Sequence, residues 1–518
     1  MMKNASRLSV SLLLIAAVQT IQAQQAKEQP APRTVGQATR QNNIAKDKKK
    51  PPPARPPEIV ALITDARTVA PEFAAFAFYR LVEAKKVTDP QWQRELLEEV
   101  FTTAATAQEP LRRRALPGTE VDTRSGYFAS AFALGMDAMT LRLRAVALML
   151  ALDARKAREM FAEMPSKLEL SPLNCKDSLV YDVVYFYDVL GKVAAQSFNA
   201  EEKAQGEDIR FVEPYLDGMT SPAQVGPLGE LVVALGNTPA RLEMLLHSFN
   251  SSLRKISGDD RTFNAEMYLL GRTFTRIEEA CRKHGVARDR MLEAFRAYVV
   301  RHLGGERCAD NVRHETRDGK DIKDYSNFNQ IVSEIDPGQK LIASIKPEDV
   351  TPSRVEGEAN VFRYWQTPAA RNLLLKAKEL RFGTGEKPLT MAERLEPKWE
   401  LKLTEFLNLL SDWDRRGESA ETDYFHQKAV LYEVLLELVP SAQTQERILR
   451  EYVAFLGQPA MQQESRIQWF WHVTPLLGGT RLGKFADRPR LLEVLSNSGD
   501  PVLRLYADLA KMLPPPKL

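Results

Sequence analysis

The sequence predicts an all-α protein, in which antiparallel helices form an α-solenoid or an irregular helical-repeat bundle after a disordered N-terminal segment. Apolar residues recur three and four positions apart, as on one face of an α-helix. Strand patterns, in which apolar and polar residues alternate, are scarce. Helix-start signals are frequent, because five side chains suited to capping stand directly before a proline whose fixed φ fits a first helical residue. They are Asp89, Ser221, Thr238, Thr367 and Asp500.

The clearest helical stretch runs from Leu141 to Pro165. Its apolar residues fall at helical spacing in two pieces, which the polar joint Asp153–Lys156 separates. Pro165 closes the second piece, because proline cannot continue a helix. The stretch therefore predicts a long helix, a tight joint and a short helix folded back on it. The expected buried residues are Leu141, Ala145, Leu148, Leu152, Ala157, Met160, Phe161 and Met164.

This hairpin resembles one unit of a tetratricopeptide- or pentatricopeptide-type repeat. The tetratricopeptide pattern has large, small, large, small and aromatic residues where this chain has Leu141, Ala145, Leu148, Ala157 and Phe161. The chain departs from that pattern in three places, where Leu, a small residue and Pro are usual: Arg144, Met164 and Glu169. The resemblance covers one unit of about 34 residues and implies stacked helix pairs. An ordinary amphipathic hairpin is the alternative.

Residues 1–23 have the pattern of a secretory signal peptide. Lys3 and Arg7 form a charged region before the apolar run Leu8–Val18, and Ile21-Gln22-Ala23 is an acceptable cleavage site. The run is shorter than the roughly 20 residues of a normal membrane span, although an uncleaved anchor is the alternative. We therefore expect an exported protein, periplasmic or secreted, with no transmembrane helix after cleavage.

Residues 24–57 are expected to form a disordered, basic, proline-rich tether. Lys46–Pro57 combines like charges with prolines, which favours an extended chain. The tether carries a net charge of +6 and the signal peptide a net charge of +2, whereas the net charge of the whole chain is +3. The body from Glu58 onward is therefore acidic at −5, so we expect no nucleic-acid partner. The tether itself is either a solvated spacer or a weak contact to an anionic envelope surface.

The rest of the chain divides into three ranges. Residues 58–304 predict an N-terminal helical-repeat domain, 305–366 a polar linker or surface excursion, and 367–518 a C-terminal helical domain. Tyr181–Phe198 is the most aromatic helix expected in the first domain. Lys398–Arg415 is the clearest in the second, ending at Gly417, with a buried stripe of Trp399, Leu403, Phe406, Leu410 and Trp413.

One short motif hints at catalysis. Glu464-Ser465 resembles the Glu-Ser pair of lytic transglycosylases, in which the Glu acts as the general acid on peptidoglycan. The resemblance implies that Trp469 and Trp471 stack on sugar rings. However, the Gly-Leu-Met-Gln block that follows the pair in that family is absent here. The alternative is that Trp469–His472 belongs to a helix partly buried in the core.

Cysteine and glycine patterns give few further sites. Three cysteines leave at least one unpaired in a monomer, and we predict a Cys281–Cys308 disulfide because export favours disulfides. The alternative is that all three are small buried hydrophobic residues. Neither a metal nor a cofactor is expected. The Cys and His spacings match no standard zinc finger, and Gly478–Phe485 ends in Phe485 where a phosphate-binding loop has Ser or Thr.

These observations favour an exported, non-catalytic helical-repeat protein that acts as a binding or scaffold module in the cell envelope. Stacked helices expose extended concave surfaces, so protein partners in the envelope are expected. The alternative is a peptidoglycan-acting enzyme or glycan-binding protein that works through Glu464.

Overall fold

Helices make up most of the chain that the computed structural model describes, and strands are few and short, so the fold is all-α, as predicted. The structure describes residues 55–115, 129–173, 179–258, 260–303, 313–315, 321–323, 365, 367–385, 387–414, 421–458, 466–478 and 488–513. The predicted signal peptide and nearly all of the predicted tether lie outside these residues.

The helices fall into two sequence segments. The N-terminal segment holds α1 (Pro57–Ala66), α2 (Pro71–Glu83), α3 (Pro90–Ala104), α5 (Ala138–Leu152), α6 (Ala154–Ala162), α7 (Val184–Gln196), α8 (Ala200–Ala204), α9 (Glu207–Asp217), α10 (Val225–Leu235), α11 (Pro239–Leu253), α12 (Thr262–His284) and α13 (Asp289–Leu303). The C-terminal segment holds α16 (Pro368–Phe382), α17 (Met391–Arg394), α18 (Pro397–Asp412), α19 (Glu421–Leu438), α20 (Ala442–Leu456), α21 (Arg466–Gly478), α22 (Arg488–Ser496) and α23 (Pro501–Met512).

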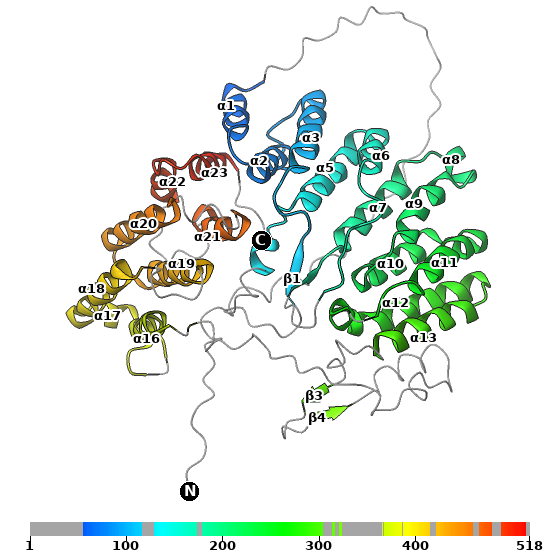
Figure 1. Ribbon diagram of the computed structural model, residues 1–518. Coiled ribbons are helices and arrows are strands. Elements are labelled where there is room, and N and C mark those ends of the chain that lie inside the picture. Colours follow the sequence, from blue (N-terminus) through cyan, green and yellow to red (C-terminus); the bar gives the residue numbers. More distant parts are fainter. Residues whose placement is uncertain are drawn as a thin grey trace, which may run out of the picture.

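Figure 1 shows that the helices form an arc of two layers. In the N-terminal segment the inner layer consists of α2, α5, α7, α10 and α12, and each of these helices packs against the next. Helices α3, α6, α9, α11 and α13 form the outer layer and pack on the inner one or on each other. Amphipathic helices that pack in this way bury their apolar faces between the layers.

The C-terminal segment continues the same arc on the other side of α1. In space the arc runs from α16 and α18 through α19, α20, α22 and α23 to α1 and α2. Both segments contribute to one cluster of buried apolar residues. The two ends of the arc are therefore α13 and α16, which follow one another near the middle of the sequence. The first and last described helices, α1 and α23, pack together midway along the arc.

The predicted helix-start signals are confirmed, with one change of helix type. The side chains of Asp89, Thr238, Thr367 and Asp500 each accept a hydrogen bond from a backbone N–H in the first turn of an α-helix, which satisfies a donor that lacks a partner within the helix. Ser221 also caps, but the turn after it is the 3₁₀ helix η2 (Pro222–Gln224), which leads directly into α10.

The predicted hairpin Leu141–Pro165 is present as α5 and α6. The joint is shorter than expected, because Asp153 alone separates the helices and caps α6 through a 3.0 Å bond from the backbone N–H of Lys156. Leu141 and Ala145 are buried as predicted, whereas Leu148 is half-buried. Helix α5 contacts α2, α3, α6 and α7, so its burial extends around the helix beyond a single stripe.

One predicted helix begins later than expected. The prediction placed Tyr181 inside a helix from Tyr181 to Phe198, but the helix begins at Val184, and Tyr181 lies in the short strand β2 (Leu179–Tyr181). Strand β2 pairs antiparallel with β1 (Arg113–Ala115), and Arg113 faces Tyr181 in the register. Pairing with a strand 66 positions away has no local sequence signal, which is why the prediction missed it.

The clearest predicted C-terminal helix is confirmed as α18, and Trp399, Leu403, Phe406, Leu410 and Trp413 are all buried. The indole N–H of Trp399 donates a 2.9 Å hydrogen bond to the carbonyl oxygen of Leu380 in α16. Gly417, the predicted stop, lies outside the described residues. So does most of the range 305–366, from which the structure describes Trp365 and the paired strands β3 (Arg313–Glu315) and β4 (Asp321–Lys323).

Candidate functional site

Helix α21 carries most of the side chains that the sequence singled out. It begins at Arg466, so Trp469, Trp471 and His472 lie in its first two turns. The candidate acid Glu464 lies outside the described residues. The two sides of α21 meet different neighbours, because Trp469 and Phe470 lie against α2 whereas His472 lies against α19.

The side chain of Trp469 belongs to the core. It is 2% exposed, and its indole N–H donates a 2.8 Å hydrogen bond to the carbonyl oxygen of Leu456. Its ring and the ring of Phe73 pack edge-to-face with 5.9 Å between centroids. Trp471 is half-buried. The geometry around Trp469 agrees with the interpretation of a helix partly buried in the core, because this indole has no face left for a sugar.

His472 is the centre of a buried hydrogen-bond network. Its Nδ1 lies 2.8 Å from Oε1 of Glu433, and its Nε2 lies 2.8 Å from Nδ1 of His426. The hydroxyl of Tyr452 donates to the same oxygen of Glu433 at 3.1 Å. The carboxylate accepts from His472, so the network assigns the His472 proton to Nδ1 and makes Nε2 the acceptor for His426. These contacts tie together α19, α20 and α21.

The network holds helices in place. Burial, with a smaller contribution from His472, keeps the pKa of His426 well below its usual value, so His426 is neutral at pH 7. A general acid or base must reach the proton that it transfers. His472 is 1% exposed and both of its ring nitrogens are engaged within the network. The arrangement therefore ties α21 to both α19 and α20. This network could not be predicted from the sequence, because Glu433, His426 and His472 belong to no common motif.

Of the two cysteines in the predicted disulfide, the structure describes Cys281. Cys281 lies near the end of α12, where it is buried. Burial raises the pKa of its thiol to about 11. Cys308 and Cys175 lie outside the described residues, so the Cys281–Cys308 pairing stays a prediction.

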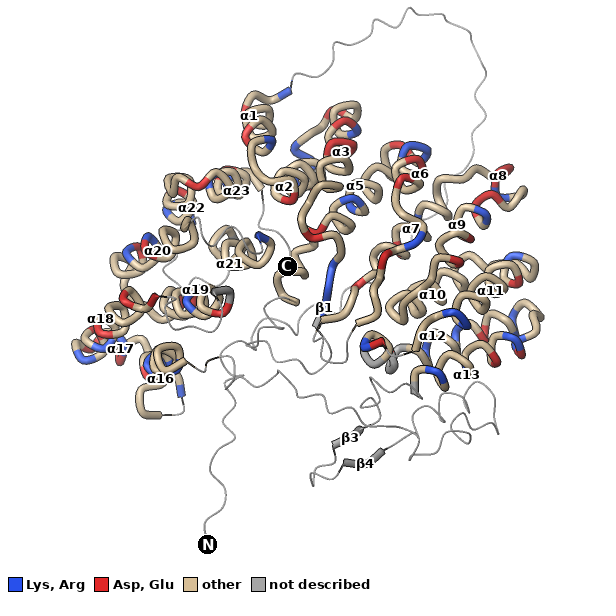
Figure 2. The backbone as a smooth tube through the Cα atoms, in the orientation of Figure 1, with Lys and Arg blue, Asp and Glu red and all other residues tan. Residues whose placement is uncertain are grey.

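Three consecutive arginines, Arg112 to Arg114, lie at the start of β1 on the inner side of the arc, and the sequence analysis did not identify them. Figure 2 shows β1 coloured for Lys and Arg on that side of the arc. Arg112 pairs with Asp182 at 3.4 Å, and Arg114 pairs with Glu266 of α12. Arg113 is exposed, and its guanidinium lies 5.8 Å from the ring centroid of Tyr181. The three consecutive arginines were the available signal, since alternate residues of a strand face opposite sides.

An exposed apolar side chain follows strand β2, the partner of β1, in the sequence. Val184, the first residue of α7, is 58% exposed. It follows β2 by three positions. We call Arg113, Tyr181 and Val184, which lie in the paired strands β1 and β2 and at the start of α7, the inner patch. A guanidinium, an aromatic ring and an aliphatic side chain are typical of protein-binding surfaces.

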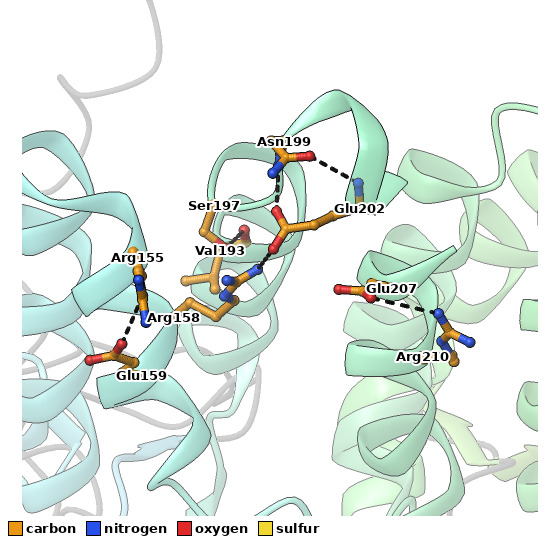
Figure 3. Close-up of polar contacts among 9 residues, drawn as sticks. All are labelled: Arg155, Arg158, Glu159, Val193, Ser197, Asn199, Glu202, Glu207 and Arg210. Carbon is orange, nitrogen blue, oxygen red and sulfur yellow. Dashed lines mark hydrogen bonds and ion pairs between the residues drawn. The ribbon is translucent and has the colours of Figure 1, made fainter. Parts of the chain in front are cut away.

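The outer rim of the arc near α6 and α8 is charged, but its charges pair with one another (Figure 3). Arg155 pairs with Glu159 at 3.2 Å, and Arg158 pairs with Glu202 at 3.0 Å. Glu202 also accepts from the backbone N–H of Asn199 in a capping box at the start of α8. The charges of these four side chains therefore balance one another.

Comparisons with known proteins identify no relative. No protein-family model matches the chain, and neither a curated protein nor a solved structure matches it. Within the described ranges, no helix is both long and apolar enough to span a membrane. Within those same ranges, no group of three or more His, Cys, Asp or Glu side chains could hold a metal ion.

Proposed function

We propose that the chain is an exported, non-catalytic helical-repeat protein that binds a protein partner in the cell envelope and acts there as a scaffold. The signal-peptide pattern of residues 1–23 supports export. The observation that carries the binding role is the two-layer arc, whose inner helices follow one another from α2 to α12. Stacked helix pairs of this kind offer long concave surfaces to extended partners.

The inner patch is the part of that surface most suited to binding. Its Arg113 can pair with a carboxylate of the partner, while the ring of Tyr181 and the exposed Val184 can bury apolar side chains. The guanidinium already lies over the tyrosine ring, which orders both groups before a partner arrives. We therefore expect a partner that presents acidic and apolar residues along an extended segment.

A pull-down from envelope extract with purified residues 58–518 tests this proposal. The account predicts one or more retained proteins, which the double variant Arg113→Glu/Val184→Asp should lose. The matched control is Arg155→Glu/Met244→Asp, which reverses the same charge and adds the same acid on α6 and α11 of the outer layer. Partners that the control loses equally, or an extract that yields none, would contradict the proposal.

A peptidoglycan-acting or glycan-binding role is the second candidate. The resemblance of Glu464-Ser465 to the transglycosylase pair favours it, whereas the burial of Trp469 removes one of its two expected sugar platforms. Incubation of the purified protein with peptidoglycan separates the two candidates. Release of soluble fragments that Glu464→Gln abolishes would establish the enzyme and refute the scaffold.

A further inference from the structure

We infer that the α1–α2 face is a binding surface for α21 and α23, and that it holds the two helical segments together even after the chain between them is cut. The two segments are residues 57–303 and 368–513. The inference is independent of the proposed function, because it rests only on contacts between described helices.

The burial of α2 shows that this helix needs cover on all sides. Every residue from Glu72 to Phe78 is buried, and Leu81 and Val82 are buried as well. A helix that is buried all round must have neighbours all round. Helices α3 and α5 come from its own segment, whereas α23 comes from the other segment and also packs on α1. Without the C-terminal segment, α2 would lose the cover that α21 and α23 give it.

An aromatic cluster fills the junction between the segments. Phe73 lies 5.3 Å from Phe470, 5.9 Å from Trp469 and 6.2 Å from Tyr506, measured between ring centroids, and all three contacts are edge-to-face. Phe76 stacks on Tyr506 at 6.1 Å. Each of the five side chains is at most 5% exposed. Edge-to-face aromatic pairs are favourable beyond the area they bury, and buried aromatic clusters dominate the binding energy of protein interfaces.

One hydrogen bond fixes how the segments align. The hydroxyl of Tyr506 donates to the backbone carbonyl oxygen of Phe73 at 2.8 Å inside this cluster. Burial raises the pKa of Tyr506 well above its usual value, with a smaller contribution from Glu72, so the hydroxyl keeps the proton that it donates. A directed bond in an apolar junction favours a single alignment of α23 on α2.

The contacts of the junction are made by the helices themselves. Leu303 and Pro368 end and begin the two segments, and the cost of closing a loop grows only slowly with its length. A covalent connection raises the local concentration of one segment near the other. The contacts between α1–α2 and α21–α23 should therefore hold the cleaved protein together as a two-chain particle.

The experiment uses the full chain with a specific protease site inserted between Glu348 and Asp349 and an affinity tag at the C-terminus. After complete cleavage at micromolar concentration, capture of the tag should retain the N-terminal fragment, with the far-ultraviolet circular dichroism unchanged. Separation of the fragments, or loss of the helical signal on cleavage, would overturn the inference.

A matched pair of variants distinguishes the junction from general destabilisation. Phe470→Leu trims a side chain in the junction, whereas Phe406→Leu trims an equally buried one in α18 of the same segment. In the cleaved protein, Phe470→Leu should raise the dissociation constant between fragments by about tenfold or more, since interface aromatics commonly carry that much. Phe406→Leu should leave it within about threefold of the parent. Equal effects of the two variants would also overturn the inference.

Discussion

The hydroxyl group of Tyr506 donates a 2.8 Å hydrogen bond to the backbone carbonyl of Phe73, and thereby fixes the last described helix to α2 across 433 positions of sequence. The bond lies inside the junction that joins the two helical segments into one arc. If the junction stabilises the whole fold, weakening it should lower the stability of both segments.

Tyr506→Phe tests the contribution of that bond. The substitution removes only the hydroxyl and keeps the ring packed on Phe76 and Phe470. We expect the free energy of unfolding to fall by about 1 kcal/mol, the usual worth of a buried hydrogen bond between uncharged groups. Urea unfolding followed by circular dichroism measures it. An unchanged midpoint would show that the bond does not contribute to stability.

Glu433→Ala tests the structural role of the histidine network. The substitution leaves His472 Nδ1 and the hydroxyl of Tyr452 without their common acceptor, which should cost about 2–4 kcal/mol of unfolding free energy. The control is Glu405→Ala, which removes the partner of Lys376 on the surface and should cost less than about 1 kcal/mol. Equal losses in urea unfolding would contradict a structural role for the network.

Asp137→Asn tests a pH dependence. Burial raises the pKa of Asp137 from its usual 3.8 to about 6, against the opposing effect of its bonds to Thr140. Because the folded state binds this proton more tightly than the unfolded state does, protonation of Asp137 stabilises the fold. This stabilisation is complete below the usual pKa of 3.8 and is lost as the pH rises through 6. Relative to the variant, the natural protein should gain up to roughly 3 kcal/mol between pH 7 and pH 4.

The Asn side chain keeps the carbonyl oxygen that caps α5 but does not titrate, so it isolates this effect. Urea unfolding of both proteins at pH 7 and pH 4 gives the comparison. A difference in stability that stays constant over this range would contradict the assigned pKa.

Thiol counting tests the predicted disulfide. One free thiol in denatured, unreduced protein, with peptide mapping that joins Cys281 to Cys308, supports the bridge, whereas three free thiols from an oxidising compartment exclude it. If Cys281 is reduced, it should react slowly with iodoacetamide in the native protein. The reason is that burial raises its pKa to about 11, and the thiolate is the reactive form.

Local signals in the sequence predicted the helices well. Asp89, Thr238 and Asp500 cap where their side chains and the following prolines indicated, because capping depends on a few adjacent residues. The buried stripe of α18 follows from helical periodicity alone. The burial of Trp469 agrees with the prediction of a helix partly buried in the core, which was the alternative to stacking on a sugar.

Relationships between distant residues could not be predicted in the same way. The strand at Tyr181 depends on pairing with Arg113, and the cluster around Phe73 depends on helices more than 390 positions later. Neither pairing leaves a periodic pattern in one sequence. The run of apolar residues Phe73–Phe78 was a signal present in the sequence, since so apolar a helix requires neighbours on more than one side.

A distance between α1 and α23 tests the single arc most directly. Spin labels on cysteines at Val60 and Arg504, both exposed, report it by pulsed electron resonance once the three native cysteines are replaced by alanine. Because the two short helices pack together, the account predicts a narrow distribution centred below about 40 Å. A broad distribution extending to longer distances would show that the two segments are not joined, and would contradict the account.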